Sequence, residues 1–267
     1  MYSPPAPRPK SPVSPTPIPP LHVTTFGEFR CQINHTLITA AQWRSQRVTQ
    51  LFLLLISADT HILTRSYIAA QLWPELDPIS ASNNVRVSLS RLRQALADTS
   101  TSNPLIIADN TRIQLLLPPH STIDIDEFRL AVNASRRIYE HRTALPHLRH
   151  AADLYRGAYL ADQPVADWQL TYREQSASEY IEIALRLGRT LLALNLHTEL
   201  IERMWTLLNH DASIEEAHRL LMASYQATGN IEMVRRVYQS CKVLLWQQLG
   251  TSPHHDTTAM YQKVNAG

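Results

Sequence analysis

Residues 77–96 read DPISASNNVRVSLSRLRQAL, and this stretch has the pattern of one amphipathic helix. Asp77 is a good N-cap and Pro78 a good first helical residue, because proline lacks only an N–H group that the first turn cannot use. Apolar residues then follow an i, i+4, i+7, i+11 spacing, which places them on one buried stripe. The stripe consists of Val85, Leu89, Leu92 and Leu96.

The remaining face of this helix is rich in arginine and serine, and it holds no acidic residue after Asp77. Arg86, Ser90, Arg93 and, at the edge of the stripe, Arg91 point away from the apolar residues. A helix with one face in a core and the other able to donate to phosphates and guanine edges is what reading a major groove requires. A solvated surface is the alternative interpretation, because charged helix faces are common.

The flanking sequence predicts the rest of a winged helix-turn-helix domain over residues 21–119. Residues 22–38 alternate as β-strands do, with a return around Asn34-His35, and a first helix is expected over about 42–57. Thr64 is expected to cap a second helix that runs through Trp73 and stops at Pro74. Two short β runs around Asp109-Asn110-Thr111 predict a hairpin wing, whose Arg112 would lie near the DNA backbone or serve as an ordinary edge-strand charge.

Residues 120–267 carry helical patterns throughout and predict an all-α second domain. A shift of 34 residues places Leu200 on Val234 and Met204 on Tyr238, which is the period of tetratricopeptide helix pairs. Such arrays bind other proteins or themselves. Most large aromatic residues of this half are expected in its core, with a partner-binding surface as the alternative.

The composition narrows the remaining possibilities. Residues 1–20 are proline-rich and predict a disordered tail or linker, with a proline-rich ligand for a partner as the alternative. Cys31 and Cys241 lack metal-site spacing, no apolar run is long enough to span a membrane, and nucleotide-binding and hydrolase motifs are missing. We therefore expect a cytoplasmic, nucleoid-associated protein with no enzymatic activity, cofactor or metal, and no membrane partner.

Several motifs together resemble the SARP-type bacterial transcriptional activators, in which an OmpR-like winged helix precedes a bacterial transcriptional activator domain. The motifs are LWPELDP (72–78) with ASNNVRVSLSRLR (81–93), DIDEF (124–128), LYRG (154–157) with LAD (160–162), EAHRLLM (216–222) and QLGTSP (248–253). The resemblance covers nearly all of residues 21–265, with both domains in the family's order.

This resemblance implies an activator that binds double-stranded DNA at direct repeats beside a promoter and recruits RNA polymerase. It carries DNA contacts over to Asn84, Arg86, Ser88, Ser90, Arg91 and Arg93. It also implies that the loop of Pro74, Glu75, Leu76 and Asp77, together with the wing, touches the sigma or alpha subunit. The tip departs from the family's usual Gly-Tyr-Arg type, because Asp109-Asn110-Thr111-Arg112 stands there and a carboxylate repels phosphate.

Two functions of different classes follow. The first is a sequence-specific transcription activator, and the acid-free arginine face favours this function. Such an activator can bind tandem sites as a homodimer. The second is a helical-repeat adaptor whose winged helix binds protein and does not read DNA. An adaptor would have no need of Arg86, Arg91 and Arg93 on one acid-free face.

Overall fold

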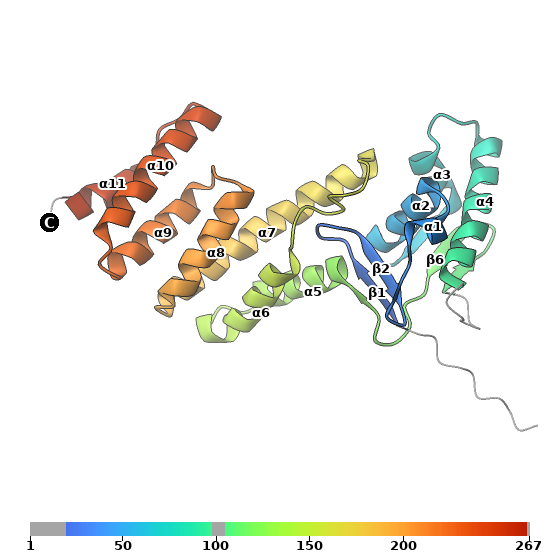
Figure 1. Ribbon diagram of the computed structural model, residues 1–267, viewed down its shortest axis with the longest axis horizontal. Helices are drawn as coiled ribbons and strands as arrows, with labels where there is room; N and C mark the ends of the chain where they lie inside the picture. Colours follow the sequence, from blue (N-terminus) through green and yellow to red (C-terminus); the bar gives the residue numbers. More distant parts are fainter. Residues whose placement is uncertain (1–19, 98–104, 266–267) are drawn as a thin grey trace, which may run out of the picture. The chain divides into compact units, whose positions relative to one another are not determined.

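The computed structural model describes residues 20–97 and 105–265 (Figure 1). It is mainly α, with a winged helix-turn-helix region followed by helical repeats, as the sequence predicted. The proline-rich tail lies outside the described residues, except for Pro20. Among the described helices, none is both long and apolar enough to cross a membrane.

Contacts divide the chain into two compact units. The first comprises Met1–His22 and Arg30–Thr122, and the second comprises Val23–Phe29 and Ile123–Gly267. No periodicity in the sequence separates Val23–Phe29 from its neighbours. Contacts nevertheless assign this short segment to the helical unit.

Three short strands near the N-terminus and one strand that follows the wing form one sheet in the order β3-β2-β1-β7. They are β1 (Leu21–Thr24), β2 (Arg30–Ile33), β3 (Thr36–Leu37) and β7 (Thr122–Ile123). Strands β2 and β3 are antiparallel and connect through Asn34 and His35, which have φ values of 49° and 64°. A two-residue hairpin turn with positive φ at both positions matches the strand twist. The predicted return at this point is confirmed.

The region predicted as one helix over about 42–57 is two helices, α1 (Ala40–Trp43) and α2 (Gln46–Ser57). Arg44 adopts a left-handed φ of 61°, which ends the first helix. The Ser45 hydroxyl then accepts the N–H of Val48 at 3.4 Å and caps the second. The prediction of a single helix was wrong because this polar junction was not recognised as a stop and a start. Helix α2 is buried almost all round, as expected for a central core helix.

The helix-turn-helix pair follows its predicted boundaries. In α3 (Arg65–Leu72), the Thr64 hydroxyl accepts the N–H of Tyr67 at 3.2 Å, which confirms the predicted cap. In α4 (Pro78–Ala97), the Asp77 carboxylate accepts the N–H groups of Ile79 and Ser80, both at 3.0 Å. The helices α2, α3 and α4 pack on one another and bury the apolar stripe of α4.

The wing is a three-stranded sheet in the order β4-β6-β5. Strands β5 (Ile106–Ala108) and β6 (Arg112–Leu115) form the predicted hairpin. The third strand, β4 (Ile62–Thr64), pairs antiparallel with β6 and was not predicted. It has only three residues and leads directly into α3, so it offers too short an alternation to be read from the sequence.

The second unit consists of successive helices, each packed on the next. They are α5 (Asp124–Arg136), α6 (His141–Leu154), α7 (Asp167–Ala193), α8 (His197–His210), α9 (Glu215–Ala227), α10 (Ile231–Leu249) and α11 (His255–Asn265). Helix α7 also packs on α9, and Gly188 permits this close approach. A Cβ atom at Gly188 would lie 2.9 Å from both Leu220 Cδ1 and Met204 Cε.

Helices α8 and α10 match at the predicted offset of 34 residues. Leu200, Met204 and Leu207 are fully buried, as are Val234 and Cys241 at two of the three matching positions. The turns before the two helices also correspond, because Asn195 and Gly229 both have positive φ. The repeat period is therefore present in the structure, while its assignment to the tetratricopeptide class stays a prediction.

The large aromatic residues of the helical unit do not all share one environment. Trp168, Tyr180, Tyr225 and Tyr238 are buried, as predicted for the core. Tyr172 and Trp205 are half-buried. Trp246 on α10 is the exception, with 66% of its surface exposed.

The segment Val23–Phe29 is fixed within the second unit by a buried carboxylate at the start of α5. Asp124 is 4% exposed and accepts the N–H of Thr25 at 2.8 Å, the hydroxyl of Thr25 at 2.6 Å and the N–H of Phe26 at 3.1 Å. The Phe26 ring packs edge-on against Phe128, with ring centroids 5.1 Å apart. The sequence predicted that Asp124 or Asp126 opens this helix; Asp124 is its first residue, and its side chain binds the distant segment.

Candidate nucleic-acid interface

Helix α4 has the two faces that its sequence predicts. Val85, Leu89, Leu92 and Leu96 are all buried, with at most 3% of their surface exposed. Between Pro78 and Ala97 the helix carries no acidic residue. Its outer face carries arginines and short polar residues, together with two exposed apolar residues, Ile79 and Val87.

The arginines of α4 divide into two positions around this outer face. Residues on an α-helix are rotated by roughly 100° per position, so Arg86 and Arg93, seven residues apart, nearly superimpose. Ser90 lies on the same exposed side, while Arg91 is near the opposite edge of the exposed arc. Within the described part of the chain, none of the three arginines forms an ion pair with a carboxylate.

Two of the predicted contact residues are less accessible than the rest. Ser88 is 6% exposed, because it falls between Val85 and Leu92 on the buried side, so its assignment to the DNA face was wrong. Asn84 is half-buried at the edge of the outer face. Of the six contact residues predicted on α4, four are exposed, namely Arg86, Ser90, Arg91 and Arg93.

Local hydrogen bonds hold two of these side chains in place. Arg86 Nη2 donates to Asn83 Oδ1 at 3.2 Å, one turn earlier on the helix. Arg93 Nη2 lies 3.4 Å from the carbonyl oxygen of Ile106 on β5, so this side chain connects α4 to the wing. Such restraint lowers the entropy lost when a guanidinium binds a phosphate or a base.

The wing tip combines an acid with two arginines. The Asp109 carboxylate accepts the N–H groups of Thr111 and Arg112 at 2.6 and 2.7 Å, and these bonds hold its pKa below its usual range. The carboxylate is therefore charged at neutral pH but faces its own loop. Arg112 is exposed, and Arg65 Nε donates to the carbonyl oxygen of Asp109 at 2.8 Å.

Sequence reasoning did not select Arg65. In the structure it is the first residue of α3 and contacts the wing tip, so it brings a cation beside Arg112. The contact depends on β4 pairing with β6, which was not predicted. The position of Arg65 directly after the helix cap Thr64 was the only local signal.

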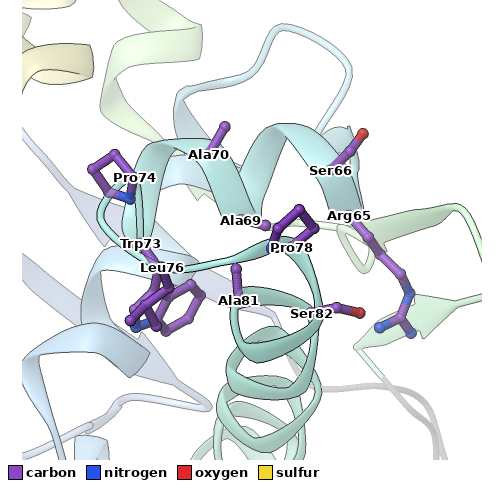
Figure 2. A pocket seen from close by; sticks show the side chains of 10 residues that line it. All are labelled: Arg65, Ser66, Ala69, Ala70, Trp73, Pro74, Leu76, Pro78, Ala81 and Ser82. Atoms are coloured by element: carbon purple, nitrogen blue, oxygen red, sulfur yellow. The ribbon is translucent and has the colours of Figure 1, made fainter.

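The loop between α3 and α4 borders an open groove of about 580 Å³, called here the α3–α4 groove. All four predicted contact residues of this loop, Pro74, Glu75, Leu76 and Asp77, are exposed. Figure 2 shows Trp73 and Leu76 at one end of the groove and Arg65 with Ser82 at the other. The pKa of Asp77 is lowered by hydrogen bonds with Ser80, so its carboxylate is charged at neutral pH while it caps α4.

No cluster of three or more histidine, cysteine or acidic side chains suited to a metal ion exists among the described residues. Cys31 is 1% exposed and Cys241 is fully buried. Burial raises the pKa of the Cys31 thiol well above its usual range and that of Cys241 to about 12. Neither thiol is therefore a reactive nucleophile.

The fold combines a winged helix-turn-helix, whose outer helix is basic, with a helical-repeat unit. These two parts, in this order, are typical of one class of transcription regulators. The family model described as bacterial transcriptional activator domain matches residues 123–265. The chain therefore belongs to this family of transcriptional activators, and the resemblance to the SARP type is confirmed.

Comparison with solved structures shows the same fold in "Mycobacterium tuberculosis EmbR in complex with low affinity phosphopeptide". The match has a TM-score of 0.73 at 17% identity and covers 93% of this chain. It spans only 65% of the EmbR chain. A comparison with curated protein sequences found no match.

Proposed function

We propose that this protein is a sequence-specific DNA-binding activator that acts in the cytoplasm, at the nucleoid. The observation that carries the proposal is the outer face of α4, where Arg86, Arg91 and Arg93 are exposed without any acidic neighbour on the helix. In a helix-turn-helix, the second helix enters the major groove and its side chains reach base edges. Arginine is suited to this role because its guanidinium binds guanine or phosphate with two parallel hydrogen bonds.

The wing supplies the second part of the proposed interface. Arg112 and Arg65 lie at its tip, where a winged domain contacts the DNA backbone. Asp109 repels phosphate there, because the N–H groups of its own loop keep its carboxylate charged, so attraction to the backbone depends on the two arginines. We therefore assign the wing to positioning on phosphate, and base reading to α4.

A binding titration with short duplexes from the DNA upstream of the coding sequence tests this proposal. Arg91→Ala or Arg93→Ala should weaken specific binding by about 1–3 kcal/mol, or roughly 5- to 150-fold, without unfolding the domain. Arg236→Ala on α10 removes the same charge from a 70% exposed side chain in the other unit and should leave binding unchanged. Equal losses in all three variants would mean that only net charge matters.

The salt dependence of binding supplies an independent measurement. Five arginines, Arg65, Arg86, Arg91, Arg93 and Arg112, make up the proposed interface of one copy. If all five neutralise one phosphate each, log K should fall with log salt at a slope of about −4 to −5 per copy, whereas α4 arginines that contact bases alone would leave a slope of about −2 from Arg65 and Arg112. A slope near zero would contradict groove binding, and a doubled slope on tandem sites would indicate a homodimer or two cooperating copies.

We further propose that the loop of Pro74, Glu75, Leu76 and Asp77 contacts RNA polymerase through its sigma or alpha subunit. The support is that the loop is exposed and borders the α3–α4 groove, so a partner can reach it. In reconstituted transcription, Glu75→Lys should reduce activation while DNA affinity stays within about twofold. Normal activation by this variant would remove the loop from the polymerase contact.

A further inference from the structure

The α3–α4 groove has a lining that fits an extended, proline-rich strand. Ala69, Ala70 and Ala81 leave space along its length, and Pro78 adds an apolar ring beside Trp73, which is 7% exposed. Grooves lined by aromatic and apolar side chains bind polyproline segments, because that conformation is already extended and loses little entropy on binding.

Charge distinguishes the two ends of this groove. Glu75 and Asp77 are exposed residues of the loop that supplies the lining residues Pro74 and Leu76. Arg65 is the charged lining residue, and Figure 2 shows it at the end away from Trp73 and Leu76. Within the described residues, Glu75 makes no hydrogen bond or ion pair, so its carboxylate is available for a cation. A proline-rich ligand for this groove should therefore carry basic residues near its acidic end.

We propose that the groove binds residues 4–10 of this chain, PPAPRPK, with Arg8 and Lys10 toward Glu75 and Asp77. The N-terminal 20 residues contain no acidic residue at all. The segment therefore combines the two features that the groove selects for, a proline-rich backbone and positive charge. This inference concerns the tail and the groove alone and goes beyond the proposed DNA binding.

The segment is long enough to reach the groove. Residues 10 and 4 precede Leu21 by 11 and 17 positions, which spans about 34–53 Å at roughly 3.1 Å per residue. A folded unit of about 100 residues has a radius of gyration of about 13 Å. Because the tail is covalently linked, its effective concentration is of millimolar order, and a weak contact suffices for occupancy.

Occupation of the groove would cover the Pro74–Asp77 loop. The tail and an external partner would then compete for this loop, so release of the tail would expose the contact. This consequence rests on the proposed polymerase contact, whereas the docking itself does not. The experiment below measures docking without DNA or polymerase.

A spin label on Ser11→Cys in the full chain tests the proposal, because both native cysteines are buried and should not react. Backbone amide signals of Ala69, Ala70 and Leu76 should lose intensity strongly, while those of α10 should not. Arg8→Glu with Lys10→Glu should abolish the loss, and adding Glu75→Lys should restore it by exchanging the charges. Glu174→Lys, on exposed α7 surface, is the matched control and should not restore it.

A mixture of spin-labelled protein and isotope-labelled protein distinguishes the tail of the same chain from the tail of a second copy. Spin-labelled protein without isotopes, mixed with isotope-labelled protein without a spin label, should show no intensity loss if the tail docks in its own chain. Loss in this mixture would assign the groove to the tail of a second copy and overturn the proposal. Signal loss spread evenly over the first unit, or no loss at all, would overturn it as well.

Discussion

Replacing Asp124 tests how firmly the segment Val23–Phe29 is held in the helical unit. The carboxylate is 4% exposed and accepts three donors, the N–H and hydroxyl of Thr25 and the N–H of Phe26. Thr25 and Phe26 are themselves buried, so water cannot easily replace the lost acceptor. Arg156 Nη2 lies 3.4 Å from the carboxylate, but its side chain is 56% exposed and contributes little.

The expected cost follows from the donors left behind. Each buried donor without a partner costs about 1–3 kcal/mol, and the Thr25 hydroxyl can rotate toward another acceptor whereas the two N–H groups cannot. Asp124→Ala should therefore destabilise the protein by about 3–5 kcal/mol, the range for breaking a buried charged network. Asp124→Asn keeps one oxygen acceptor and should cost about 1–2 kcal/mol.

Chemical denaturation of the full chain, followed by circular dichroism, measures the free energy of unfolding of the helical unit. Glu127→Ala is the matched control, because it removes a carboxylate from the same first turn of α5 without touching Val23–Phe29. That variant should lose only the helix-dipole contribution of about 0.3–1 kcal/mol. Equal losses for Asp124→Ala and Glu127→Ala would refute the role of the buried network.

Three further outcomes follow from the helical unit. The fragment 120–267 lacks the segment that covers Asp124, so it should be less stable to urea than the same helices in the full chain; equal stability would count against the division of the chain described above. Gly188→Val should cost about 2–3 kcal/mol, because the added atoms collide with Met204 and Leu220, and an unchanged denaturation midpoint would disprove that close approach. Burial lowers the pKa of His218, so the unfolded chain takes up a proton at a higher pH than the folded chain does. The free energy of unfolding should therefore fall as pH drops below about 6.5, and it should fall less steeply in His218→Gln. Parallel pH profiles of the two proteins would contradict this.

Most elements of the fold could be predicted because their signals are local. The N-caps Thr64 and Asp77, the periodic stripe of α4 and the turn at Asp109 each act within a few residues, and the structure contains all of them. The helix break at Arg44 is also local, but a left-handed arginine has no distinctive sequence signal.

The features that sequence reasoning missed depend on contacts between distant residues. Strand β4 exists because β6 pairs with it, about 50 positions later in the chain. Asp124 meets Thr25 across 99 positions, and no periodicity in either stretch reveals that contact. Ser88 was misplaced for a smaller reason, because a short polar residue can occupy the buried side of a helix without interrupting its apolar pattern.

The partners of the arginines differ between α4 and the helical unit. In the helical unit, several arginines pair with acids on other helices. Examples are Arg136 with Glu182, Arg149 with Glu199, and Arg189 with Glu216. On α4, by contrast, Arg86, Arg91 and Arg93 share one helix without any acid, and the described partners of Arg86 and Arg93 are neutral, the Asn83 amide oxygen and the Ile106 carbonyl oxygen. Three positive charges that no acid of the helix neutralises are favourable against an anionic surface, and a DNA backbone is the anionic surface that a winged helix fits.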